Sequence, residues 1–307
     1  LPAQRSPSLP GPAFLSNSAS TGYLTNLLPR PLRMDGILST SVAFGDDFRA
    51  DLYYRDPRPP EERQPARNRQ GGGGGRGALP PGTKLPAVLW LHSQTYATGY
   101  AQQFEYTLDH LTKSGFAVFA FDQIGFGTRV EQAQNFYERF PKWSLLGKMV
   151  TDTRCALDQI TALDIIDSSK IYLLGYAMGA KVALFTAALD ERVTGVVSCC
   201  GFAPLRLHNA RQGTEGLRHY SHLHGLLPRV GYFIGHESRL PVDYDEILAC
   251  IAPRPMCILA PTLDRYSPVE DVRAAVDAAR QVYRLLGRED QPEMRTPLGF
   301  NGFLIEW

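Results

Sequence analysis

From residue 85 onward, short apolar runs alternate with longer stretches of helical pattern. The apolar runs have the length of buried strands and lie at Ala87–Leu91, Ala117–Phe121, Ile171–Leu174, Val193–Cys199 and Met256–Ala260. The helical stretches between and after them are Tyr100–Ser114, Leu145–Leu163, Ala180–Leu189 and Pro268–Leu286. This alternation predicts an α/β fold with a mostly parallel central sheet and flanking crossover helices.

Three segments depart from this pattern. Residues 1–37 are rich in Pro and Ser and predict an arm or linker before a single domain of residues 38–307. Residues 56–86 combine paired prolines with a run of glycines, a composition that cannot bury enough apolar surface to order itself. We expect this flexible insertion to lie in a hairpin connection, because strand-like segments flank it. Residues 203–243 predict a short cap region.

Composition narrows the possible partners. The chain carries 32 Lys and Arg against 31 Asp and Glu, so its charge gives no reason to expect nucleic acid or an anionic membrane. No stretch approaches the roughly 20 apolar residues of a transmembrane helix. The five cysteines lack paired C-x-x-C spacing and lie in apolar runs, which favours buried thiols over disulfides or a zinc site.

The segment from Ile171 to Ala180 has the pattern of a nucleophile elbow. A buried strand runs into Gly175-Tyr176-Ala177-Met178-Gly179, and an apolar helix follows, as in the strand–turn–helix context of G-x-S-x-G. Glycine is needed on both sides of the turn because the turn is sharp and its central residue is strained. Ala177 therefore stands at the position of a nucleophile.

Other segments fall where such a site needs them. Gln94 lies in the loop after the strand that ends at Leu91, and we expect that loop to supply one oxyanion-hole amide, with Met178 supplying the other. Asp264 follows the Met256–Ala260 strand, where the acid of a catalytic triad belongs.

Together these segments resemble the dienelactone hydrolase and acetyl xylan esterase-like branch of the α/β-hydrolase superfamily. The resemblance covers the chain from about residue 38 to its end and includes the segment Ile251-Ala252-Pro253-Arg254-Pro255 before a strand. It implies an α/β-hydrolase fold and catalysis by Ser, Asp and His in that order, without a metal or an organic cofactor. It also favours an exported protein, and a chain that begins at Leu1 agrees with a removed leader.

The chain departs from this pattern at two of the three catalytic positions. Ala177 has no hydroxyl and cannot attack a carbonyl. All seven histidines precede Asp264 in the sequence, whereas the family histidine should follow it. Asn301 or Gly302 occupies the expected position, of which we assign Gly302, and neither can act as a general base near neutral pH.

Two functions remain open at this point. The first is a catalytically inactive hydrolase homologue that serves as a binding, scaffold or assembly subunit, with the N-terminal arm or the Gly-rich loop as the attachment segment for an unknown protein partner. The alternative is a serine carboxylic-ester hydrolase for small acyl or carbohydrate esters, represented by a form in which alanine replaces the serine.

Several residues have a structural alternative to a site role. The spacing of His219, His222 and His224 matches no zinc motif, so solvated or capping histidines are favoured over a metal site. Arg254 is expected to donate to carbonyls or an ion pair rather than to a substrate. A set of aromatic side chains is equally expected to line a pocket over the elbow or to pack in the core: Tyr96, Tyr100, Trp143, Tyr176 and Tyr266.

Overall fold

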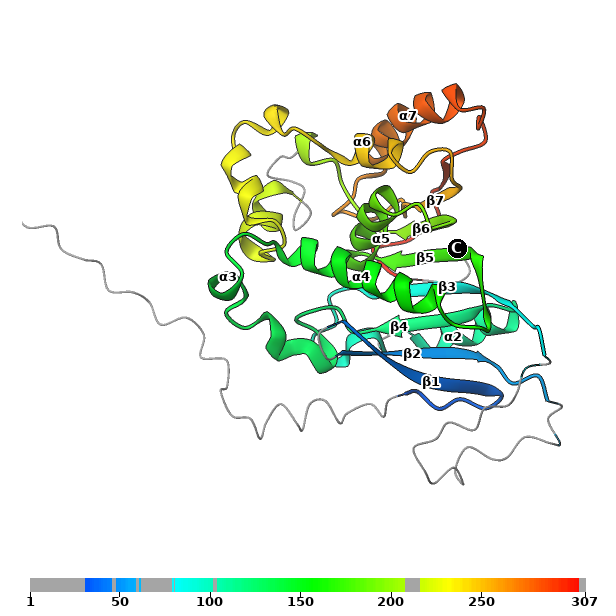
Figure 1. Ribbon diagram of the computed structural model, residues 1–307. Helices are drawn as coiled ribbons and strands as arrows, with labels where there is room; N and C mark the ends of the chain where they lie inside the picture. Colours follow the sequence, from blue (N-terminus) through cyan, green and yellow to red (C-terminus); the bar gives the residue numbers. More distant parts are fainter. Residues whose placement is uncertain are drawn as a thin grey trace, which may run out of the picture.

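The computed structural model describes residues 31–45, 48–58, 61, 79, 81–101, 104–207 and 216–303. These residues form an eight-stranded sheet in the order β1-β2-β4-β3-β5-β6-β7-β8 (Figure 1). At one edge, β1 (Ile37–Phe44) pairs antiparallel with β2 (Phe48–Arg55), and β2 pairs antiparallel with β4 (Ala117–Phe121). The parallel strands are β4, β3 (Leu85–Leu91), β5 (Ile166–Tyr176), β6 (Gly195–Cys199), β7 (Met256–Leu259) and β8 (Glu293–Arg295).

This sheet confirms the predicted α/β-hydrolase architecture and corrects one connection. The five predicted strands after residue 85 correspond to β3, β4, β5, β6 and β7. The expected hairpin between β2 and β3 is wrong, because β4 lies between these two strands and the hairpin partner of β2 is β1. The chain between β2 and β3 therefore joins two strands that are not neighbours in the sheet; residues 59–60, 62–78 and 80 lie outside the described residues.

Helices cover both faces of the sheet. Side chains alternate between the faces along each strand, so Trp90 and Val118 join the cluster beneath α2 (Phe104–Lys113), whereas Leu89 and Phe119 join the larger core on the other face. That larger core includes α4 (Leu145–Thr161), α5 (Met178–Leu189), α6 (Tyr244–Ala249) and α7 (Val269–Leu285). Figure 1 shows α4 crossing the strands in front of the sheet and α6 beside α7 near β7.

Short helices complete the chain between these elements. Near the sheet they are η3 (Tyr96–Ala101), η4 (Gly127–Ala133) and α3 (Phe136–Arg139). In the predicted cap region they are η5 (Leu205–Leu207), the π-helix η7 (His219–Leu223), η8 (Pro228–Phe233) and η9 (Glu237–Arg239). The cap ends where Asp243 and Glu246 form a capping box at the start of α6. Residues 208–215 of the cap and residues 1–30 of the predicted arm lie outside the described residues.

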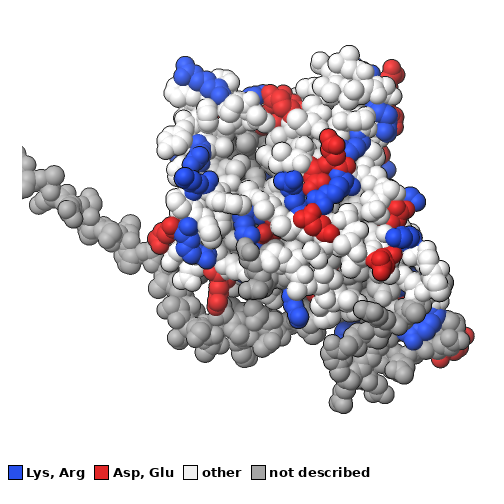
Figure 2. Space-filling model, in the orientation of Figure 1, with Lys and Arg blue, Asp and Glu red and all other residues white. Residues whose placement is uncertain are grey.

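The surface carries charge of both signs. On the face in Figure 2, Lys and Arg lie among Asp and Glu over much of the described surface. No helix within the described ranges is long and apolar enough to cross a membrane. Arg254 donates to the carbonyls of Ala187, Asp190 and Val193, which confirms the expected structural role of this side chain.

Candidate active site

The elbow at the end of β5 holds Ala177 in a strained backbone conformation. Its φ of 48° and ψ of −110° lie in a region that L-residues rarely adopt. The Ala177 amide donates a 2.9 Å hydrogen bond to the carbonyl of Cys199 on β6, and the Ala177 carbonyl accepts from the amides of Ala180 and Lys181. The turn is therefore fixed from both sides, and its central residue is presented at the N-terminal end of α5.

The two elbow glycines are required by close backbone contact. A Cβ on Gly179 would overlap the carbonyl of Leu91 and lie 2.6 Å from the carbonyl oxygen of His92. A Cβ on Gly175 would overlap the carbonyl of Gly179 and lie 2.6 Å from the amide nitrogen of Ala180. Both contacts involve backbone atoms that cannot move aside, so the structure explains why the sequence has glycine at both positions.

Asp264 lies at the same edge of the sheet, in the loop after β7. It is 4% exposed, and Oδ2 accepts a 3.1 Å hydrogen bond from the side-chain amide of Asn301. The hydroxyl of Tyr176 donates at 3.1 Å to the amide oxygen of Asn301. Burial raises the pKa of the Asp264 carboxyl above its usual value, although hydrogen bonds from the Tyr266 amide and from Asn301 act in the opposite direction.

The contact with Asp264 favours Asn301 over Gly302 as the residue at the position of the family histidine. Gly302 has no side chain, and its carbonyl accepts hydrogen bonds from the Cys199 and Cys200 thiols at 3.8 and 3.5 Å. The contact between these two thiols, together with burial, raises the pKa of Cys199 well above its usual value. The Cys199 thiol is therefore protonated and inert at neutral pH.

His92 is buried at the end of β3 and has a structural role. The Gln123 amide donates to its Nε2 at 2.9 Å, so the ring proton is on Nδ1, which donates to the Ser93 carbonyl at 2.6 Å. Both ring nitrogens are thus engaged with backbone atoms, in a neutral imidazole. His92 holds the β3 and β4 loops together and cannot serve the elbow as a base.

The proposed oxyanion-hole residues flank the elbow. Met178 is the first residue of α5, and amides in the first turn of a helix have no intrahelical acceptor. Gln94 is exposed, and its side-chain nitrogen lies 3.1 Å from Nδ1 of His224 in the cap. This contact joins the β3 loop to the cap. Convergence of the Gln94 and Met178 amides on one oxyanion stays a prediction.

Lys181 is a site residue that sequence reasoning missed. It is 3% exposed, stands four residues after Ala177 on α5, and its ammonium lies 5.7 Å from the ring centre of Tyr220 in the cap. A cation–π contact of this kind offsets part of the cost of burying the charge. The available signal was a single lysine one turn into an otherwise apolar helix.

The aromatic residues and histidines considered in the sequence analysis lie in different parts of the structure. Tyr100 belongs to the core, where its hydroxyl donates to Asp51, whereas Tyr176 belongs to the site. Among the residues that the structure describes, no three His, Cys, Asp or Glu side chains come together as metal ligands would. His222 and His224 have separate partners, Ser221 and Gln94.

The site has the backbone arrangement of an acyl-transfer site, but two of the side chains that the reaction needs are replaced by others. The strained elbow, the helix N-terminus and the buried Asp264 are present. A methyl group stands at the nucleophile position and an amide stands beside Asp264, so neither a nucleophile nor a general base occupies these two places.

Comparison with known proteins shows that this chain is similar to esterases and hydrolases. The family model described as glucuronyl esterase, fungi, matches residues 93–287, which include the elbow and Asp264. The protein YtaP of Bacillus subtilis (strain 168), to which a hydrolase function is ascribed, is 31% identical over 220 residues, or 67% of this chain and 69% of YtaP. The carbohydrate esterase MZ0003, from an unknown prokaryotic organism, is 29% identical over 148 residues, or 48% of this chain and 34% of that protein.

Solved structures share the fold at lower identity. An esterase of carbohydrate esterase family 15 from a marine bacterial metagenome, called promiscuous, has a TM-score of 0.63 at 16% identity, covering 94% of this chain and 87% of its own. A glucuronoyl esterase of the same family from Caldicellulosiruptor kristjansonii has a TM-score of 0.61 at 21% identity, covering 89% and 74%. These likenesses establish the architecture around the elbow.

Proposed function

Because this chain belongs to the glucuronyl esterase family of hydrolases, we propose that its site is that of a carboxylic-ester hydrolase for esters of uronic acids, carried with alanine at the nucleophile position. The matched residues 93–287 support this proposal because they span the elbow, Lys181 and Asp264. MZ0003, a carbohydrate esterase by name, supports the sugar part of the substrate.

The backbone of Ala177 is the observation that carries the proposal. A residue in a sparsely populated region of φ and ψ costs about 1–3 kcal/mol and persists only where its surroundings impose it. Ala177 keeps φ 48° and ψ −110° although it has no hydroxyl to present. A turn with only a structural role gains nothing from that strain, whereas a nucleophile elbow requires it.

The chemistry follows from the positions of the chain's own groups. A hydroxyl at position 177 would attack the ester carbonyl, and the developing oxyanion would lie near the Met178 amide at the start of α5. The proton of that hydroxyl needs a base held by Asp264, at the place where Asn301 lies. Efficient hydrolysis therefore requires substitutions at both positions, whereas a hydroxyl at position 177 without the base would react much more slowly.

The experiment compares hydrolysis of benzyl D-glucuronate by four proteins: the parent chain, Ala177→Ser, Asn301→His and the double variant. We expect turnover by the double variant, a rate about 10²–10⁴-fold lower for Ala177→Ser alone, which lacks the base, and none above background for the parent or Asn301→His. Ala180→Ser/Asn301→His is the matched control, because it places a hydroxyl three residues away on α5. A double variant no faster than this control would contradict the proposal.

A second candidate, binding of a uronate ester without turnover, is favoured by Asn301 itself. Its amide group satisfies Tyr176 and Asp264 at the same time, which completes the network without a base. Such a function predicts that the parent chain binds methyl D-glucuronate in a calorimetric titration and releases no methanol. Absence of binding to the parent, together with turnover by the double variant, would exclude this candidate.

Two further proposals concern the protein as a whole. The predicted protein partner would attach through the N-terminal arm or the Gly-rich loop; cross-linking yields that are unchanged on removal of residues 1–30 or 62–78 would contradict this. Export is the second proposal, in line with the resemblance to exported esterases. Detection of the protein only inside its source cells after fractionation would contradict it.

A further inference from the structure

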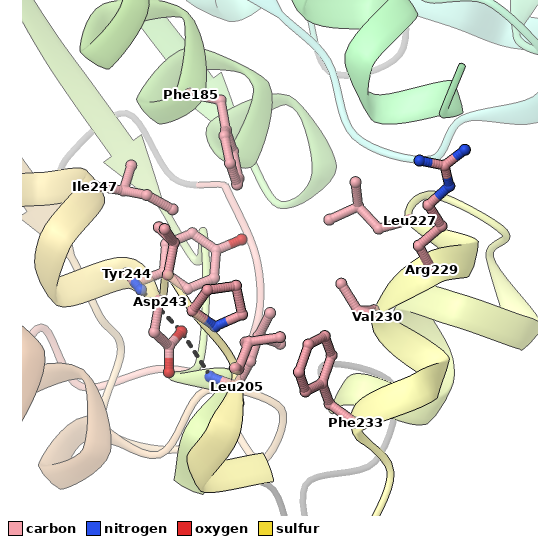
Figure 3. A pocket seen from close by; sticks show the side chains of 12 residues that line it. Phe185, Leu205, Leu227, Arg229, Val230, Phe233, Asp243, Tyr244 and Ile247 are labelled. Atoms are coloured by element: carbon pink, nitrogen blue, oxygen red, sulfur yellow. Dashed lines mark hydrogen bonds between the residues drawn. The ribbon is translucent and has the colours of Figure 1, made fainter. Parts of the chain in front are cut away.

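A pocket lies between the cap and the helices α5 and α6, outside the elbow. It has a volume of about 230 Å³. Apolar side chains from four parts of the chain line it: Phe185 on α5, Leu205 on η5, Leu227, Val230 and Phe233 at η8, and the segment from Leu240 to Ile247 that leads into α6. In Figure 3 the side chains of Phe185, Phe233 and Tyr244 surround the hollow from different elements. The twelve lining residues thus surround space that no described side chain fills.

This pocket is separate from the ester site. Phe185 stands eight residues after Ala177 on the same helix, which corresponds to about 12 Å along the helix axis. Tyr220 lies between the two places, with its ring near the Lys181 ammonium and its hydroxyl 2.6 Å from the hydroxyl of Tyr244. A ligand in the pocket would therefore touch the far side of the Tyr220–Tyr244 pair and not the residues around Ala177.

The interior of the pocket selects an apolar ligand. Asp243 is the one acidic residue of the lining, and its carboxylate already accepts hydrogen bonds from the amides of Leu205, Arg206 and Tyr244. The hydroxyl of Tyr244 is engaged with Tyr220. The inner walls offer a ligand no unsatisfied polar group, so the part that enters the pocket gains by apolar contact.

The size and the walls favour an aromatic ring. Cavities of about 150 Å³ with apolar walls bind benzene, so this pocket has room for a phenyl ring with a short chain. The Tyr244 ring is held in place by Phe202, which stacks on it at 4.4 Å with an angle of 18°, and Phe185 approaches it at 6.1 Å and 73°. A fixed ring surface of this kind suits edge-to-face or offset contact with a bound ring.

Arg229 sets the charge at the rim. It is one of the lining residues and is exposed, and it forms no ion pair or hydrogen bond with another of the described residues. In Figure 3 its guanidinium lies beyond Leu227 and points away from the hollow. A carboxylate on a chain that leaves the pocket past Leu227 would lie near this guanidinium while the ring occupies the interior.

We propose that the pocket between the cap, α5 and α6 is a second ligand site, which binds an aryl-alkyl carboxylate of about the size of 3-phenylpropanoate. The ring occupies the apolar interior against Tyr244 and Phe185, and the carboxylate lies at Arg229. This site is independent of the proposed esterase chemistry, since it needs neither the residue at position 177 nor Asn301.

The test titrates the full chain with three probes: 3-phenylpropanoate, 3-phenylpropan-1-ol and propanoate. We expect the acid to bind about two- to fivefold more tightly than the alcohol, the range of an exposed charge pair, and propanoate to show no saturable binding. Arg229→Gln should remove the advantage of the acid, whereas Arg239→Gln, an exposed arginine on η9, should leave it unchanged. Equal affinity of acid and alcohol for the parent chain would overturn the role of Arg229.

Two experiments test where the aromatic probe binds. Val230→Trp fills the pocket and should abolish binding of both aromatic probes, but it should not change the results of the hydrolysis experiments at position 177. Because that variant can fail to fold, nuclear Overhauser contacts are also measured on the unaltered protein between the probe's ring protons and the methyl groups of Leu227, Val230 and Ile247. Contacts to these methyls support the site; saturable binding with contacts elsewhere, or no binding of any aromatic probe, overturns it.

Discussion

The side-chain amide of Asn301 donates a 3.1 Å hydrogen bond to Oδ2 of Asp264 and joins the loops that follow β7 and β8. A histidine in the same place would be oriented by the same buried carboxylate, as the third residue of a triad is. Asn301 keeps the hydrogen bond to Asp264 but, unlike a histidine, cannot act as a general base. The network therefore has a structural role that can be measured apart from catalysis.

Asn301→Ala should lower the free energy of unfolding by about 1–2 kcal/mol, because it leaves the buried Asp264 carboxylate with one hydrogen bond fewer and the Tyr176 hydroxyl without its acceptor. Asn301→Asp should cost more, since it places a second carboxylate against the first. Urea unfolding of the three proteins checks this order. Equal stability of Asn301→Asp and the parent would show that the network does not hold the loops.

Ala177→Gly should stabilise the protein. Glycine relieves the strain at φ 48° and ψ −110°, which costs about 1–3 kcal/mol, and loses about 0.5–1 kcal/mol through the entropy of the unfolded chain. The difference predicts a gain of about 1 kcal/mol in the free energy of unfolding. Ala177→Val, with a branched Cβ, should lose stability, so the two substitutions move the urea midpoint in opposite directions. A loss of stability for Ala177→Gly would mean that the elbow is unstrained.

Gly179→Ala should be severely destabilising, by more than about 3 kcal/mol, because its Cβ would overlap the carbonyl of Leu91 in the centre of the sheet. Gly235→Ala is the matched control: it has φ 81° but no atom within 4 Å of the added Cβ. The control should cost about 1 kcal/mol from backbone strain alone. Thermal unfolding of both variants separates steric overlap from conformational preference, and similar losses would contradict the overlap.

The stability of the protein should fall in acid in part through Asp190. Hydrogen bonds from Arg192 lower the pKa of this carboxyl to about 2, against about 3.9 in an unfolded chain. A depressed folded pKa gives stabilisation that is present above the unfolded value and is lost as the pH falls through the folded value. Asp190→Asn should therefore cost about 1–2 kcal/mol at pH 7, and the difference from the parent should shrink between about pH 4 and pH 2. A pH-independent difference in urea unfolding would assign the effect to packing instead.

Much of the fold could be predicted because its signals are local. Each of the strands β3 to β7 contains a run of mostly apolar residues, and the elbow has glycines at two positions where a Cβ would meet backbone. The three-residue strand β8 carries no comparable pattern, and pairing of β2 with β1 and β4 rather than β3 depends on long-range contacts. The order of the strands in the sheet therefore could not be predicted from local sequence patterns.

In the candidate site, too, some residues could be predicted from local sequence signals and others only from contacts in the structure. Position 177 comes directly after β5, and Asp264 lies five residues after the end of β7 (264 − 259), so the order of strands along the sequence was enough to propose both. Asn301 against Gly302 is a choice between neighbours in a loop, and only the contact with Asp264 distinguishes them. Lys181 and Tyr220 meet across 39 positions of the sequence (220 − 181), between α5 and the cap, so no short motif joins them.

The most direct measurement of the central claim is the mass of the protein after reaction with a fluorophosphonate, which phosphonylates an activated serine and is independent of the substrate. The claim is that the elbow retains the geometry of a nucleophile and lacks only the side chains at positions 177 and 301. We predict that Ala177→Ser/Asn301→His gains the mass of one phosphonyl group, located in the peptide that contains position 177, and that the parent and Ala180→Ser/Asn301→His gain none. An unlabelled double variant that unfolds at the same urea concentration as the parent would contradict the account.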